Sequence, residues 1–149
     1  MFADFFKRIS QDKKIIFIVE DNNLYAKSLK TFIQTRFPNI KDIKIFRIGE
    51  MCLLEMHRNP SIVIMDYFLN SKYTEAENGL EIIKRIKEQK PQTKIVVLSA
   101  QEKFSVALEA IKQLDCTYIQ KNKEAFDKVE QFIKEILDSI PPLAQGQLN

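Results

Sequence analysis

The residues best placed to do chemistry are polar side chains that close apolar runs. Glu20 and Asp21 follow "IIFIV", Asp66 closes "SIVIM", Ser99 closes "KIVVL", and Lys121 follows "CTYIQ". An aspartate at the end of a fully apolar run must find solvent, a partner or a metal, because an unpaired buried charge is costly. These positions are therefore the first candidates for a site.

The residue types indicate a hard cation and a phosphate. Two carboxylates about 4 Å apart repel by roughly 4 kcal/mol at an effective dielectric near 20, so a cation is needed among them. Mg²⁺ prefers carboxylate and carbonyl oxygens, whereas zinc prefers the His and Cys ligands that these run ends lack. Lys121 adds a charge for a carboxylate or phosphoryl oxygen, and Ser99 adds a hydroxyl donor.

Five apolar runs of strand length must position these groups. Three are apolar on both faces, as in the middle of a parallel sheet covered by helices on both sides. The predicted strands span 14–20, 43–48, 61–66, 94–100 and 116–121.

Segments of helical periodicity alternate with the strands. Apolar residues recur there every three or four positions, which predicts amphipathic helices. The stripes are Tyr25, Leu29, Phe32, Ile33 and Phe37; Leu80, Ile83 and Ile86; Phe104, Ala107, Leu108, Ile111 and Leu114; and a last one within 123–139, with a short helix over 49–58. The alternation predicts a (βα)5 doubly wound parallel sheet. In such sheets ligands bind outside the carboxyl ends of the strands, so all five polar groups would meet at one edge.

Bulk properties suit one globular domain. The chain has 149 residues, 45% of them hydrophobic and 29% charged. Its net charge of +3 is spread without a basic block, so nothing indicates nucleic acid. Cys52 and Cys116 lie far apart among apolar neighbours, which is typical of small buried residues in a reducing compartment. No apolar run reaches the roughly 18 residues of a spanning helix, and no signal peptide precedes the first strand, so we expect a cytoplasmic protein without membrane contact.

At this point the sequence resembles the receiver domain of two-component response regulators. The resemblance rests on "VED" at 19–21, "IMD" at 64–66, "LSA" at 98–100 and "YIQK" at 118–121, in that order. It implies the flavodoxin-like strand order 2-1-3-4-5. We expect an N-terminal extension over 1–13, a receiver domain over 14–140 and a disordered tail over 141–149. Because no output domain follows the last helix, the sequence suggests a single-domain regulator.

The resemblance also implies a role for each candidate residue. Asp66 would accept a phosphoryl group from a histidine kinase or phosphotransfer protein. Mg²⁺ would be held by Glu20, Asp21, Asp66 and the backbone carbonyl of Phe68. Lys121 and Ser99 would stabilise the phosphoryl group. Such a receiver promotes only its own phosphorylation and dephosphorylation, so it is not an enzyme in the usual sense.

The resemblance also implies positions that control the conformational switch and the lifetime of the phosphoryl group. Tyr118 would act as the aromatic switch that follows Ser99 inward. Phe68 and Gln101 would tune water access to the phosphoryl group, and the bulk of Phe68 predicts slow self-dephosphorylation. The downstream partner is a protein that the sequence does not identify, and a homodimer stays open.

The sequence departs from the family in three places. Asn122 follows Lys121 where most receivers have a cis proline, which predicts a trans peptide. Leu114 stands where the family usually ends its fourth helix with glycine. The loop from Asp66 to Gly79 is several residues longer than usual, and it borders the expected site.

Other readings remain open for single residues. Asp21 could cap the first helix, as could Asn22 or Asn23. Ser99 could be a simple strand-end hydroxyl, Lys121 a solvated lysine, and Tyr118 a core aromatic. His57, the single histidine, fits a surface or packing role. The helical face of Phe2, Phe5, Phe6 and Ile9 fits a packed or frayed N-terminal helix first, a dimer contact second and a membrane-surface helix third.

Three other functions compete with phosphorylation. A pseudo-receiver would keep the fold as a binding module. A flavodoxin-like cofactor binder would use the same crevice, although "EDNN" places negative charge where a cofactor phosphate would lie. An Mg²⁺-dependent phosphatase would use a nucleophilic aspartate, but Phe68 stands where its second aspartate is usual.

Overall fold

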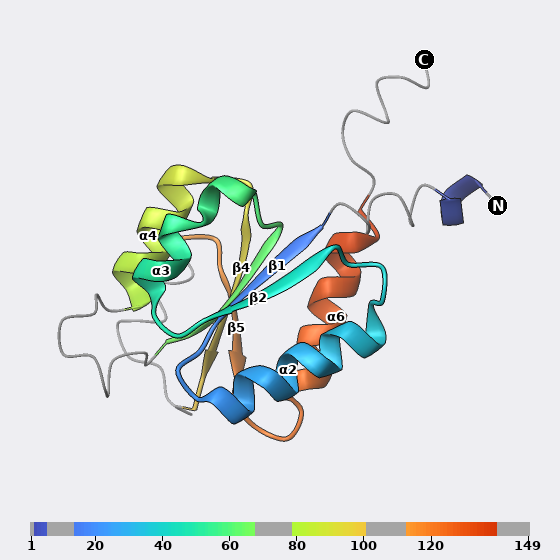
Figure 1. The fold of residues 1–149 in the computed structure, drawn as a ribbon, viewed down its shortest axis with the longest axis horizontal. Coiled ribbons are helices and arrows are strands. Elements are labelled where there is room, and N and C mark those ends of the chain that lie inside the picture. Colours follow the sequence, from blue (N-terminus) through green and yellow to red (C-terminus); the bar gives the residue numbers. More distant parts are fainter. Residues whose placement is uncertain (1, 6–13, 68–78, 101–112, 140–149) are drawn as a thin grey trace, which may run out of the picture.

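The structure is a computed structural model, and it describes residues 2–5, 14–67, 79–100 and 113–139. Within these ranges the chain forms a five-stranded parallel sheet in the order β2-β1-β3-β4-β5 (Figure 1). The strands are β1 (Ile15–Val19), β2 (Asp42–Phe46), β3 (Ile62–Asp66), β4 (Lys94–Ser99) and β5 (Thr117–Gln120). The predicted strand order and parallel sheet are confirmed, and the strand ends differ by one or two residues.

The middle of the sheet is the most apolar part of the fold. Every residue of β1 and β3 is buried, as is every residue of β4 after Lys94. Alternate side chains enter opposite core layers: Phe17 and Val63 pack on one side, and Ile18 and Ile64 on the other. Continuous apolar runs are therefore required here, because both faces are covered.

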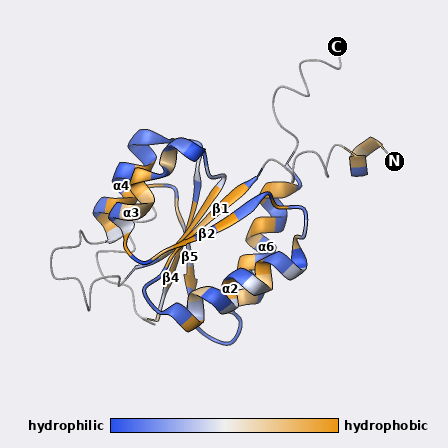
Figure 2. Ribbon diagram, viewed as in Figure 1, coloured by the Kyte–Doolittle hydropathy of each residue, from blue (hydrophilic) through white to orange (hydrophobic). Residues whose placement is uncertain are grey.

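Helices cover both faces of the sheet. The helices α2 (Asn23–Arg36) and α6 (Ala125–Leu137) lie on one side, and α3 (Gly49–Leu54) and α4 (Gly79–Gln89) on the other (Figure 1). A short 3-10 turn, η1 (Met56–Arg58), follows α3. The helices turn hydrophobic residues toward the sheet and hydrophilic ones outward (Figure 2).

The predicted stripes locate the helices with one correction. In α4 the buried side chains are Ile82, Ile83 and Ile86, whereas Leu80 is only half-buried. Two of the three predicted stripe residues are therefore buried, and Ile82 joins them; Gly79 lies against Tyr67, whose backbone oxygen a side chain there would meet. The stripe predicted over 104–114 falls largely outside the described residues. Asp115 follows it in the left-handed conformation (φ 56°), which Asp tolerates better than most residues.

Asn22, not Asp21, caps α2. The Asn22 side chain accepts a 3.0 Å hydrogen bond from the backbone N–H of Tyr25. This satisfies one of the unpaired donors of the first helical turn. The capping reading of Asp21 is therefore wrong, and its carboxylate must be explained in another way.

Several smaller predictions are also settled. Cys52 is buried and Cys116 half-buried, both as free thiols, and burial raises the pKa of Cys52 to about 12. His57 is exposed, and its ring contacts the backbone oxygen of Leu54 at 3.1 Å. No helix among the described residues has the length and apolar character to cross a membrane.

Candidate functional site

The site lies at the carboxyl edge of the sheet, where the ladder continues one residue past three strands. The Glu20 N–H donates to Phe46 O at 2.9 Å, and the Tyr67 N–H donates to Leu98 O at 3.0 Å. On the next strand pair, the Lys121 N–H donates to Ser99 O at 2.7 Å. The backbone at each position is thus fixed by the sheet, as expected for groups that follow parallel strands.

Three carboxylates meet at this edge. One oxygen each of Glu20, Asp21 and Asp66 lies within 4.8 Å of the others. Glu20 is only 3% exposed and Asp66 8%, whereas Asp21 is half-buried. Acids are rarely buried unless they are paired, so a cluster with this burial needs positive charge.

Lys121 supplies part of that charge. Its Nζ contacts Glu20 Oε1 in a short hydrogen bond and lies 3.4 Å from Asp66 Oδ2. Its side chain is 17% exposed, so the reading of Lys121 as a solvated surface lysine is wrong. Burial lowers the pKa of Lys121, but hydrogen bonding to Glu20 and the charge of Asp66 outweigh this and raise it overall.

Glu20 remains incompletely compensated. The pKa of Glu20 is raised to about 7, first by burial and then by the neighbouring Asp66, and Lys121 lowers it only in part. Its second oxygen, Oε2, is buried and lacks a hydrogen-bond partner among the described residues. An orphaned buried acceptor beside two more carboxylates fits a hard divalent cation, whose ligands are carboxylate oxygens. The residues present therefore fit Mg²⁺, which Glu20, Asp21 and Asp66 would hold.

Ser99 and Tyr118, the predicted switch residues, lie on the neighbouring strands β4 and β5. Ser99 is 2% exposed and ends β4 beside β3, which carries Asp66. Tyr118 is half-buried on β5 and packs against the core layer beneath α3 and α4. Phe68 and Gln101 lie outside the described residues. The Lys121–Asn122 peptide is trans, as predicted, and the Asn122 side chain accepts a hydrogen bond from the Glu124 N–H at 2.9 Å.

Sequence reasoning missed Tyr25 as part of the site. Its ring lies under the Lys121 ammonium, with Nζ 4.5 Å from the ring centroid. The prediction placed Tyr25 in the apolar stripe of the helix. The available signal was its place in the first turn of α2, four residues after Asp21, which brings it to the edge where the strands end.

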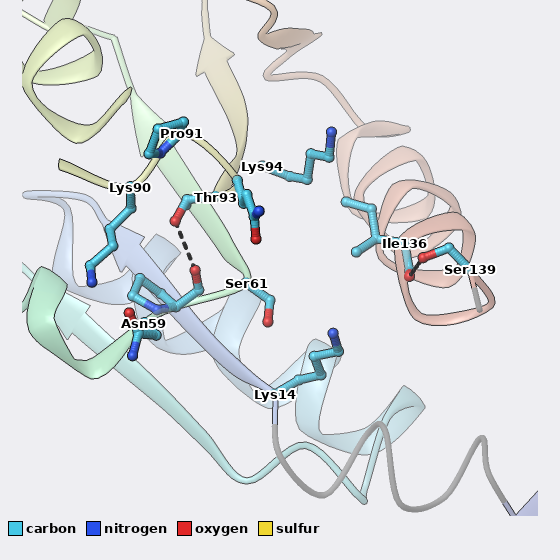
Figure 3. Close-up of a pocket in the computed structure, with 11 residues that line it drawn as sticks. Lys14, Asn59, Ser61, Lys90, Pro91, Thr93, Lys94, Ile136 and Ser139 are labelled. Carbon is cyan, nitrogen blue, oxygen red and sulfur yellow. Dashed lines mark hydrogen bonds between the residues drawn. The ribbon is translucent and has the colours of Figure 1, made fainter. Parts of the chain in front are cut away.

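A separate cavity of about 670 Å³ lies at the opposite, amino edge of the sheet (Figure 3). Lys14, Lys90 and Lys94 line it together with Thr93 and Ser139. The Thr93 hydroxyl already donates to Pro60 O at 2.9 Å, and the Ser139 hydroxyl to Ile136 O at 2.6 Å. None of the predicted site residues lines this cavity.

Fold and site together define a flavodoxin-like α/β protein with an acidic cluster and a lysine at the carboxyl edge of its sheet. The sequence profile of the response regulator receiver domain matches residues 16–134. The chain therefore belongs to the response regulator receiver domain family, whose members are signalling modules of two-component systems.

Individual relatives agree with this assignment. The photosynthetic apparatus regulatory protein RegA of Rhodobacter capsulatus is 23% identical over 144 residues, which cover 97% of this chain and 73% of RegA. The signal receiver domain of a DNA binding response regulator from Colwellia psychrerythraea superposes with a TM-score of 0.70 at 23% identity, covering 85% of this chain and 99% of that one. A putative response regulator from Chloroflexus aurantiacus gives 0.68 at 22% identity, covering 85% and 98%. These two structural likenesses support the fold.

Proposed function

We propose that this protein is a phospho-accepting receiver in which Asp66 takes a phosphoryl group in the presence of Mg²⁺. The observation that carries the proposal is the burial of Asp66 between two further carboxylates and the Lys121 ammonium. Structural ion pairs need one acid and one base, whereas this edge gathers three acids around one lysine. Such an excess of carboxylates suits a site that is completed by a cation and a phosphoryl group.

The chemistry follows from the position of each group. A carboxylate oxygen of Asp66 attacks phosphorus, and a new O–P bond forms as the P–N bond to the donor histidine breaks. The departing imidazole keeps the bonding electron pair and takes a proton. Lys121 neutralises negative charge on the transferred phosphoryl oxygens. Mg²⁺, held by Glu20, Asp21 and Asp66, would neutralise further charge there.

Phosphorylation would then be transmitted through Ser99 and Lys121. Their backbones are joined by the hydrogen bond from the Lys121 N–H to Ser99 O. A phosphoryl group on Asp66 would draw the Ser99 hydroxyl toward it, and Tyr118 would fill the space that Ser99 leaves. The local charge change would thereby alter the surface around β5 and α6, to which a partner protein binds.

The direct test is incubation with phosphoramidate or acetyl phosphate and Mg²⁺, followed by intact mass measurement. Wild type should gain one phosphoryl group, and Asp66→Asn should gain none. Asp42→Asn is a matched control, because Asp42 begins β2 at the other edge of the sheet. A wild-type protein that gains no phosphoryl group would favour the pseudo-receiver reading, and an adduct on Asp66→Asn would assign the acceptor elsewhere.

A flavodoxin-like cofactor site has less support at this edge. A cofactor phosphate at the end of β1 would lie against Glu20 and Asp21, two carboxylates of the same sign. A purified protein that carried flavin colour would contradict this reasoning.

A further inference from the structure

The sheet fixes the backbone of Lys121 through the hydrogen bond from its N–H to Ser99 O. The ammonium reaches the site on a flexible side chain. Its ammonium is attracted by Glu20 and Asp66, and it must still be available to the incoming phosphoryl group. A lysine stem loses considerable rotamer freedom when it is held in one place. A rigid wall beside the ammonium would reduce this loss of rotamer freedom.

Tyr25 forms such a wall. The Lys121 Nζ lies over the face of its ring, 4.5 Å from the centroid, and a cation within about 6 Å of a ring face is attracted by its quadrupole. The ring itself is held by an edge contact with Phe126, at 5.5 Å and 74°, and Phe126 packs on Phe32 at 5.2 Å. The wall is therefore built from α2 and α6 together.

The hydroxyl of Tyr25 takes no part in this contact. It is buried and has no hydrogen-bond partner within the described residues. Phenylalanine at this position would keep the ring face and remove an unsatisfied polar group, which is a favourable or neutral change. An aliphatic side chain would keep apolar packing but remove the face that attracts the ammonium.

We propose that Tyr25 is a positioning residue for phosphoryl transfer, whose ring face holds the Lys121 ammonium beside Asp66. This inference rests on the proposed function for its effect on rate, although the placement of Lys121 can be measured without any phosphoryl donor. Tyr25 acts through Lys121 and forms no bond to the reacting atoms.

The rate test compares three variants at saturating Mg²⁺ with phosphoramidate as donor. Tyr25→Leu should phosphorylate about fivefold more slowly than wild type, because a partly desolvated cation–π contact has about this worth. Tyr25→Phe should match wild type. Phe37→Leu is the control, since Phe37 is a half-buried aromatic at the other end of the same helix, and it should also match. A wild-type rate for Tyr25→Leu, or an equally slow Tyr25→Phe, would overturn the proposal.

A double-mutant comparison separates positioning from general packing. In a Lys121→Met background, Tyr25→Leu should cause no further loss of rate, because the residue through which it acts is already gone. A further fivefold loss in that background would assign Tyr25 a merely structural role and would contradict the proposal.

A spectroscopic test is independent of phosphorylation. The methylene protons next to Nζ of Lys121 should be shifted upfield by the ring current in wild type and in Tyr25→Phe, and should lose this shift in Tyr25→Leu. Absence of the shift in wild type would overturn the positioning role. If the shift is present but wild type takes no phosphoryl group, the proposed function fails while the placement of Lys121 by Tyr25 stands.

Discussion

Two carboxylates at opposite edges of the sheet have pKa values that are shifted in opposite directions. Asp42 begins β2 at the amino edge, where hydrogen bonding to Arg58 at 2.6 Å lowers its pKa. Glu20 follows β1 at the carboxyl edge, where burial and the neighbouring Asp66 raise its pKa to about 7 despite its contact with Lys121. The difference shows that charge at one edge is arranged as an ordinary half-buried ion pair, whereas the other edge holds negative charge in excess of its partners.

The same contrast holds for the lysines. Lys121 lies among buried acids, with its side chain 17% exposed, while Lys94 at the amino edge is exposed beside an open cavity. Surface charges of the second kind contribute little to stability or specificity. Burial of charge, not its presence at a strand end, therefore distinguishes the carboxyl edge from the amino edge.

The largest expected effect comes from removing the buried lysine. Lys121→Met leaves Glu20 and Asp66 without their shared partner, so we expect a loss of roughly 2–4 kcal/mol in unfolding free energy without Mg²⁺. The phosphorylation rate should fall about a hundredfold or more, because charge on the transferred phosphoryl group is no longer compensated.

Urea denaturation and phosphoramidate kinetics measure both effects. Lys94→Met is the matched control, and its unfolding free energy should change by less than about 0.5 kcal/mol. Equal destabilisation by the two variants would remove the distinction between the edges.

Binding of Mg²⁺ should have the next largest effect on stability. If the ion binds with a millimolar dissociation constant, about tenfold excess should stabilise the folded protein by roughly 1.4 kcal/mol and raise Tm by a few degrees. Asp21→Asn should abolish this rise, because Asp21 is one of the three expected ligands. Thermal scans with Mg²⁺ and with EDTA measure the rise, and a full rise in Asp21→Asn would remove this residue from the metal site.

Neutralising one carboxylate should have a smaller effect on the unfolding free energy, with opposite signs at the two edges. In EDTA at pH 7.5, Glu20→Gln removes a buried charge with too little compensation and should stabilise the protein by about 1 kcal/mol. Asp42→Asn removes one partner of the half-buried pair with Arg58 and should destabilise the protein slightly. Urea midpoints compare the two variants, and destabilisation by Glu20→Gln would show that its carboxylate is fully compensated.

The smallest expected effect is the pH dependence of the stability that Asp42 contributes. Its pKa is lowered in the folded state, so its contribution is present above the unfolded value of about 3.9 and is lost as pH falls through the folded pKa. The Tm difference between wild type and Asp42→Asn should therefore be small at pH 7 and should shrink as the pH falls below the unfolded value. A difference that does not change as the pH falls through the acid range would assign the effect to packing.

Sequence patterns predicted the sheet well because buried parallel strands must be apolar on both faces. The runs around Phe17, Val63 and Val97 leave few alternatives, and the strand ends then bring Glu20, Asp66, Ser99 and Lys121 together. The cap of α2 depended on the choice of Asn22 over Asp21, and the buried face of α4 includes Ile82 where the pattern had Leu80. Periodicity alone cannot make those choices.

Tyr25 shows a different limit. Its spacing suits a core stripe, and its ring does pack beside the layer formed by α2 and α6. The contact with Lys121 depends on a residue almost a hundred positions away, just past β5, so no local pattern could reveal it. Its place one turn after Asp21 was the single available sign.

The central claim is that Asp66 forms an acyl phosphate, and borohydride reduction tests it most directly. Borohydride converts an aspartyl phosphate to homoserine, which tandem mass spectrometry locates in the sequence. After treatment with phosphoramidate and Mg²⁺, we expect homoserine at position 66 and none when Mg²⁺ is replaced by EDTA. Homoserine at another aspartate, or no homoserine under either condition, would contradict the account.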